Sequence, residues 1–277
     1  MSSRLLLVCL LPLALSACKP PPEAPVELGE LSLYLFANFD DPDPLVMEAG
    51  MANMLTFLED FETGVDLSID SAATERSWTI PALEEENWGG ADHVPGVDPL
   101  NQDSVSVAVR SSYAGDAHSP LIGLGDQTPL ESSSSARYDR TFLNDFDAWH
   151  TAREGALRTS NDIDRDNILL TLTYEAHKDY RWVNLPGGEV ATIGRSWISS
   201  SYVNEPGAGT SGEDVMEFFS NMEVTIPSGD TSLRYNAVWG YVAFVPPVDD
   251  AVLANTVRNG IQEGFENTEI YLSGDGS

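Results

Sequence analysis

The chain has 277 residues, with 14 Lys or Arg against 44 Asp or Glu, so its formal net charge at pH 7 is −30. Such an acidic chain repels the phosphates of nucleic acids, which excludes DNA and RNA as partners. Hydrophobic residues make up 42% of the sequence, which is enough for a packed core and excludes wholesale disorder.

The first 17 residues have the pattern of a secretory signal peptide. Arg4 supplies a positive charge, and an apolar run of eleven residues follows from Leu5 to Leu15. That run is far shorter than the ~20 residues that a membrane-spanning helix needs. It ends in Leu15-Ser16-Ala17-Cys18, and these four residues resemble the lipobox of bacterial lipoproteins.

The resemblance implies that residues 1–17 are removed and that Cys18 carries acyl chains as the first residue of the mature protein. Two or three such chains hold a protein at a membrane almost irreversibly, because each buried methylene contributes ~0.8 kcal/mol. We therefore expect a membrane-anchored protein of the bacterial cell envelope. Lys19 stands where inner-membrane lipoproteins usually have Asp, which favours the outer membrane. An ordinary signal peptide followed by a chance cysteine is the alternative.

The segment after the signal peptide, residues 18–30, is predicted to be an extended tether. It contains four prolines and no apolar periodicity, a composition typical of stiff linkers. Folding is expected to begin near Leu31, and residues 31–277 are expected to form one acidic domain. Apart from Cys18 the mature chain has no cysteine, because Cys9 lies in the signal peptide. We therefore expect neither disulfides nor thiol catalysis.

The start of the domain is predicted to hold a strand and then a helix. The apolar run 31–36 suits a short buried strand. Asp43 and Pro44 form a helix-start pair, and the apolar stripe behind them keeps helical spacing, which predicts a helix over 44–60. The stripe consists of Met47, Met51, Met54 and Leu58. A methionine stripe can line an adaptable pocket, but plain core is the favoured interpretation.

The middle of the chain carries weaker signals. Residues 82–137 are expected to be rich in surface loops, with one alternating, strand-like segment from Ser104 to Arg110. Further on, Phe142, Phe146, Trp149 and Arg153 follow one another at helical spacing, which predicts a helix over 142–153.

An acidic cluster after this predicted helix could bind calcium. Asp162, Asp164 and Asp166 match ligand positions 1, 3 and 5 of a Ca²⁺-binding loop. The match then fails, because Asn167 replaces the glycine at position 6 and Thr173 replaces the bidentate glutamate at position 12. An acidic turn before the next strand is the favoured interpretation, and a Ca²⁺ site at these three aspartates is kept as the other.

The last third of the chain predicts an antiparallel meander followed by a helix. Residues 168–174 alternate, the turn 186–188 separates strands at 180–185 and 190–199, and the turn 227–230 separates 224–226 from a strand over 233–245. Asp249 or Asp250 caps a helix whose apolar stripe is Leu253, Val257, Ile261 and Phe265. The predicted fold class is α+β. By element order alone it resembles the helix-grip, or START-like, architecture, in which a sheet curves around a C-terminal helix.

Catalytic motifs are scarce in this sequence. The four histidines are scattered, and Gly207 to Gly212 fits a dinucleotide-binding pattern poorly, because two carboxylates follow it directly. We therefore expect a non-catalytic module that binds a small apolar ligand or an envelope partner, or that supports the envelope structurally. A hydrolase of envelope or extracellular polymers without a local motif is the first alternative. A calcium-dependent surface or adhesion protein is the second.

Anchoring through Cys18 has a direct test. Changing Cys18 to Ala removes the thiol that would carry lipid, so the variant is expected to leave the detergent phase in a detergent-partition experiment, or to stay uncleaved. Wild-type protein that partitions into water, or an unmodified mature N-terminus by mass spectrometry, would contradict the lipobox interpretation.

Overall fold

The computed structural model describes residues 23–62, 77–96, 98–166, 171–203, 215–244 and 247–274. Cys18 with its lipobox, and the glycine-rich stretch 207–212, lie outside these residues. Within them, nine strands form one antiparallel sheet in the order β1-β2-β9-β8-β6-β5-β4-β3, with β7 paired to β8. The strands are β1 Ser77–Thr79, β2 Asp103–Ser111, β3 Ser135–Phe142, β4 Ala156–Asp166, β5 Thr171–Asn184, β6 Val190–Trp197, β7 Tyr202–Val203, β8 Val215–Ser228 and β9 Thr231–Ala243.

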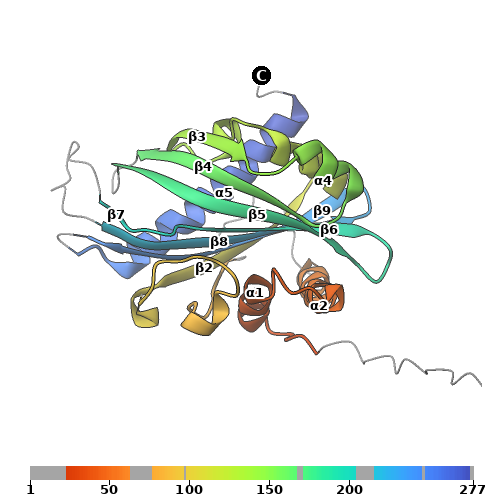
Figure 1. Ribbon diagram of the computed structural model, residues 1–277, viewed down its shortest axis with the longest axis horizontal. Helices are drawn as coiled ribbons and strands as arrows, with labels where there is room; N and C mark the ends of the chain where they lie inside the picture. The colour runs from red at the N-terminus through yellow and green to blue at the C-terminus, as the bar shows by residue number, and fades with distance from the viewer. Residues whose placement is uncertain are drawn as a thin grey trace, which may run out of the picture.

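Helices lie on both faces of this sheet. The sheet curves around α5 (Asp250–Ser273), whereas α1 (Leu28–Ala37) and α2 (Pro44–Glu62) pack on its outer face (Figure 1). Two short helices, α3 (Gly115–His118) and α4 (Phe146–Ala152), belong to the connections before and after β3. The predicted α+β class is confirmed, and so is the helix-grip arrangement of an antiparallel sheet around the C-terminal helix.

The two predicted hairpins are confirmed. The turn between β5 and β6 places Gly188 at φ 86°, and the turn between β8 and β9 places Gly229 at φ 60°. Only glycine adopts these angles without steric cost, so the two turns are encoded locally. A bulge between Met216 and Phe218 interrupts the pairing of β8 with β9. Bulges increase local twist, which helps a long strand pair to curve around a helix.

The predicted strand over 31–36 is wrong, because these residues belong to α1. Leu31 and Leu35 are fully buried at a spacing of four residues, as a helix requires. The hydroxyl of Ser32 donates to the Leu28 carbonyl (2.7 Å) and is hydrogen-bonded to the Tyr235 hydroxyl on β9 (2.7 Å). Six apolar residues satisfy either periodicity, and packing against the sheet decides between them.

The folded part also begins earlier than predicted. Helix α1 starts at Leu28, inside the segment expected to be a tether. Upstream of it, the side-chain amide of Asn53 donates to the carbonyls of Ala24 (3.0 Å) and Pro25 (2.9 Å). The chain from Ala24 onward is therefore held against α2.

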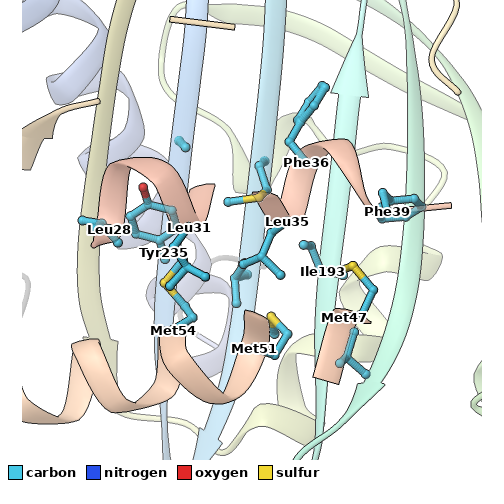
Figure 2. Close-up of a cluster of buried hydrophobic side chains, with 14 of the residues drawn as sticks. Leu28, Leu31, Leu35, Phe36, Phe39, Met47, Met51, Met54, Ile193 and Tyr235 are labelled. Atoms are coloured by element: carbon cyan, nitrogen blue, oxygen red, sulfur yellow. The ribbon is translucent and has the colours of Figure 1, made fainter. Parts of the chain in front are cut away.

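The predicted helix over 44–60 is confirmed as α2, and its methionine stripe is core. The Asp43 carboxylate accepts a hydrogen bond from the Leu45 amide (3.1 Å), as an N-cap does. In Figure 2, Met47, Met51 and Met54 of this stripe lie beside α1 and in front of the strands, near Leu35 and Tyr235. The stripe residues are at most 1% exposed: Met47, Met51, Met54 and Leu58.

A buried arginine joins the α1–α2 connection to the sheet. Arg195 on β6 is 1% exposed and pairs with Asp40 (2.6 Å), while its guanidinium lies 4.6 Å from the centre of the Phe39 ring. Next to it, Arg181 on β5 donates to the carbonyls of Phe39 (2.6 Å) and Asp41 (3.0 Å). These contacts hold the connection, and with it both N-terminal helices, on the outer face.

The middle of the chain is more ordered than its loop-rich composition suggests. The alternating segment Ser104–Arg110 is part of β2, which pairs with β9 over its whole length. The helix predicted over 142–153 is shorter, because Phe142 ends β3 and the Asp145 carboxylate caps α4 through the Ala148 amide (2.9 Å). Helix α4 therefore starts after Asp145, which lies between the first two aromatic residues of the predicted helix.

Packing of the outer face predicts a strong contrast within α2. Met51→Ala is expected to lower the free energy of unfolding by about 2–5 kcal/mol, since it opens a cavity under α1. Leu45→Ala, on the same helix but 41% exposed, is expected to change it by no more than about 0.5 kcal/mol. Urea denaturation followed by circular dichroism measures both, and equal effects would contradict this packing.

Candidate functional site

A cavity of about 350 Å³ lies between the concave face of the sheet and α5. Strands β3 to β6, β8 and β9 provide its floor, α5 provides one wall, and the segment 118–134 closes another side. The wall contributes Leu253, Val257, Ile261 and Phe265, the four positions of the predicted apolar stripe. This stripe therefore faces the cavity as well as the sheet.

The strand register sorts the cavity floor into an apolar and a polar end. Phe219 on β8 pairs with Gly240 on β9, and Met216 pairs with Val242, so this end of the cavity is apolar. Three further cross-strand pairs follow toward the β8–β9 turn, and they are mostly polar: Asn221 with Val238, Glu223 with Asn236, and Thr225 with Arg234. Side chains of one parity share a face, so the floor changes from apolar to polar along the strands.

An ion pair lies at the polar end. The Lys178 ammonium on β5 donates to the Glu223 carboxylate at 2.7 Å, and the lysine side chain is 6% exposed. Burial opposes the charge on Glu223, but the adjacent Lys178 outweighs burial and lowers the pKa of the carboxyl. Burial likewise opposes the charge on Lys178, and Glu223 more than restores it, so the lysine pKa is raised. Both groups are charged at neutral pH.

Two further cations point inward, and both have partners. The Arg165 guanidinium donates to the Glu131 carboxylate (3.1 Å) and to the Ser135 hydroxyl. Arg140 uses all three of its nitrogens: Nε donates to the Asn161 amide oxygen (3.0 Å), Nη1 to the Ile122 carbonyl (2.8 Å) and Nη2 to the Tyr180 hydroxyl (2.9 Å). These arginines tie the floor of the cavity to the segment that closes it.

The fourth inward cation is different. Nε and Nη1 of Arg234 on β9 are buried and have no hydrogen-bond partner among the described residues. The guanidinium carbon lies 4.6 Å from the centre of the Phe265 ring of α5, a cation–π contact. Burial lowers the pKa of Arg234, and the carboxylates of Glu223 and Glu269 oppose that effect.

A histidine lies near Arg234. His118 is 6% exposed, and its Nε2 is hydrogen-bonded to the Ser111 hydroxyl at 2.9 Å. The same hydroxyl donates to the Glu269 carboxylate, which also accepts from the Ser112 amide (2.9 Å). Burial, reinforced by the charge of Arg234, lowers the pKa of His118 to about 3. The imidazole is therefore neutral, and Glu269 fastens the end of α5 to β2.

The three aspartates considered for calcium lie on the other face of the sheet. Asp162, Asp164 and Asp166 belong to β4, so the predicted acidic turn is wrong. They alternate with Ile163 and Arg165, which face the cavity. Strand pairing overrides the loop-like composition of this segment.

The carboxylates of this aspartate row have local partners. Asp164 accepts from Arg137 (2.8 Å) and from the Thr173 hydroxyl (2.8 Å), while Asp166 accepts from Thr171 (3.0 Å). The Arg137 hydrogen bond lowers the pKa of Asp164. Within the described ranges, no group of three or more His, Cys, Asp or Glu side chains is arranged to hold a metal ion. Cys18, the other predicted site residue, lies outside them.

Sequence reasoning missed the residues that line the polar end. The predicted strand over 233–245 contains Arg234, but no role for that residue follows from the sequence. Lys178 shares the parity of Tyr174 and Tyr180 on a strand where that parity is buried. A lysine or arginine among the inward-facing positions of a predicted strand was the signal that could have indicated a buried charged site, because charges are rarely buried without a partner.

No helix in the described segments is long and apolar enough to cross a membrane.

Comparison with known proteins gives structural likeness without sequence likeness. No protein-family model and no curated protein matches this sequence. Among solved structures, a STAR-related lipid transfer protein of Xanthomonas axonopodis is 10% identical, with a TM-score of 0.41 over 61% of this chain and 85% of that one.

Two further structures are similar at the same level. The Zhui aromatase/cyclase of a Streptomyces species is 6% identical, with a TM-score of 0.36 over 63% of this chain and 93% of that one. Human STARD10 is 7% identical, with a TM-score of 0.36 over 61% and 64%. Likeness of this degree does not extend to ligand or activity.

The lowered pKa of His118 predicts a specific pH dependence of stability. On unfolding, the pKa returns to about 6.5, so below that pH the unfolded chain binds a proton that the folded chain refuses until about pH 3. As the pH falls between these values, the free energy of unfolding of the wild type is expected to decrease by up to about 1.4 kcal/mol per pH unit more than that of His118→Gln. The glutamine amide keeps a hydrogen-bond partner for Ser111. Urea denaturation at about pH 6, 5 and 4 measures the difference. Parallel curves for the two proteins would contradict a buried neutral imidazole.

Proposed function

We propose that this protein binds a small, mainly apolar molecule in the cavity between the sheet and α5. The observation that carries the proposal is the cavity itself. Its volume of about 350 Å³ falls within the range of small-molecule sites, and its walls combine an apolar lining with a few fixed polar groups. If the cavity held no ligand, filling it with side chains would raise the free energy of unfolding by about 1 kcal/mol or more.

Two of the three described carboxylates that line the cavity are held in ion pairs, which favours binding over hydrolysis; the third, Asp103, has a pKa raised by burial and by the charge of Asp250. A hydrolase of the kind considered from the sequence needs carboxyl groups that converge and differ in pKa. Here Glu223 is neutralised by Lys178, and Glu131 by Arg165. A carboxylate held in an ion pair is a poor proton donor, whereas a general acid has to keep its proton at neutral pH.

The place of action proposed here is the bacterial cell envelope, with the outer membrane favoured. The support is the lipobox ending at Cys18, and Lys19 after it. Acyl chains on Cys18 would hold the binding domain beside a membrane, where apolar molecules concentrate. Detergent partition of Cys18→Ala tests this anchor separately from the cavity.

A glycine on the cavity floor allows a sharp test of ligand binding. A Cβ added at Gly240 would meet only the Phe218 carbonyl oxygen, at an ordinary contact distance of 3.8 Å, so Gly240→Leu extends a side chain into the apolar end. N-phenyl-naphthylamine, a neutral dye that brightens in apolar surroundings, is expected to bind the wild type saturably. Gly240→Leu is expected to weaken that binding about tenfold or more, because the leucine occupies the space of the dye.

The matched control is Gly187→Leu, at an exposed turn position where an added Cβ meets nothing within 4 Å. It is expected to bind the dye like the wild type. Absence of saturable binding in the wild type, or equal binding by Gly240→Leu, would contradict a ligand site in this cavity.

A further inference from the structure

At the polar end of the cavity, Nε and Nη1 of Arg234 have no acceptor among the residues that the structure describes. We propose that Arg234 is the receptor for an anionic group, so that the ligand is an amphipathic acid whose apolar body lies toward Phe219 and Val242. This inference rests on the proposed function and adds the chemical class of the ligand. Carboxylates, and phosphate or sulfate esters of the same shape, share the required chemistry.

Arg234 differs from the other inward cations because it has no hydrogen-bond acceptor within the described part of the chain. Lys178 is paired with Glu223, Arg165 with Glu131, and Arg140 has an acceptor for each of its three nitrogens. Nε and Nη1 of Arg234 are buried with no acceptor in the described part of the chain. Buried guanidinium nitrogens without acceptors are unfavourable, and an incoming anion would recover part of that cost.

The surroundings of Arg234 hold its guanidinium ready for such a group. The guanidinium carbon lies 4.6 Å from the centre of the Phe265 ring of α5, and this cation–π contact helps to hold the group in place. A planar guanidinium held in this way presents its N–H groups as a fork, which fits the two oxygens of a carboxylate or phosphate. The imidazole of His118 beside it is neutral, so it does not supply a second cation for the anion.

Glu223 and Glu269, the two carboxylates whose charges act on Arg234, already have other hydrogen-bond donors. Glu223 accepts from the Lys178 ammonium at 2.7 Å. Glu269 accepts from the Ser111 hydroxyl and from the Ser112 amide. Neither forms an ion pair with Arg234 in the described structure. Their charges moderate the attraction of Arg234 for an anion, but neither carboxylate serves as an acceptor for Nε or Nη1 of Arg234.

The register gives the ligand its direction. Arg234 pairs with Thr225 at the polar end, and Val242 pairs with Met216 at the apolar end of the same two strands. An acid with an unbranched apolar chain matches this gradient, because its charge and its chain separate to opposite ends. A neutral apolar molecule would leave the Arg234 end empty of acceptors.

Two ligands that differ only in the anionic group test the inference. Dodecanoate and dodecanol are each titrated against the bound N-phenyl-naphthylamine, and the concentration that displaces the dye is compared. The wild type is expected to bind dodecanoate about tenfold or more tightly than dodecanol. Arg234→Met is expected to lose this preference and to bind dodecanol within about twofold of the wild type. Arg137→Met, on the outer face of the sheet, is expected to keep the preference.

The outcomes separate the two proposals. If the dye does not bind the wild type, the cavity proposal fails. If the dye binds but the wild type shows no preference for dodecanoate, or if Arg234→Met keeps that preference, the anion receptor alone is overturned.

A measurement on the wild type covers the case in which Arg234→Met does not fold. Dodecanoate labelled with carbon-13 at the carboxyl group is titrated with acid by NMR in the bound state. A guanidinium partner is expected to lower the carboxyl pKa below its value in water. A carboxyl pKa at or above that value would overturn the proposal.

Discussion

The structure depends on the central strands of one sheet being buried on both of their faces. Strand β9 shows the constraint most clearly, since Tyr235 and Trp239 pack under the N-terminal helices while Arg234 and Val238 face the cavity. A register slip of one residue would exchange the two sets and put a guanidinium into the core. The long hairpin of β8 and β9, closed by Gly229, therefore fixes core and cavity at once.

The two faces differ in what they contribute. The outer face buries the methionine stripe of α2, the leucines of α1 and the aromatic residues of β9, and such apolar burial is the main favourable term in folding. The concave face encloses charged pairs, whose desolvation largely offsets their attraction. An incompletely filled cavity with a polar end can persist there because the opposite face supplies the packing. The proposed ligand site and most of the apolar packing thus lie on opposite sides of one sheet.

The parts of the fold that sequence predicts are those with local causes. Helix α2 follows from its Asp43 cap and methionine spacing, α5 from Asp249 and its stripe, and the hairpins from glycine turns. Helix α1 was missed because a six-residue apolar run fits two periods. The site could not be predicted, because its contacts join distant segments: Lys178 meets Glu223 only once β5 and β8 are placed on either side of β6. The acidic turn predicted at the aspartates of β4 is wrong for the same reason, since pairing with β3 and β5 decides the conformation of this segment.

The inward orientation of the cations changes how the outside of the molecule interacts with a membrane. Arg140, Lys178 and Arg195 are buried, and Arg165 and Arg234 face the cavity, so few bases remain to offset the acids at the surface. Anionic headgroups repel such a surface over about a Debye length of ~10 Å at 0.1 M salt. A domain anchored as proposed would stand off from its own bilayer at low ionic strength and approach it as divalent cations rise. Exchange of ligand with the lipid phase would then be gated by the ionic composition of the surroundings.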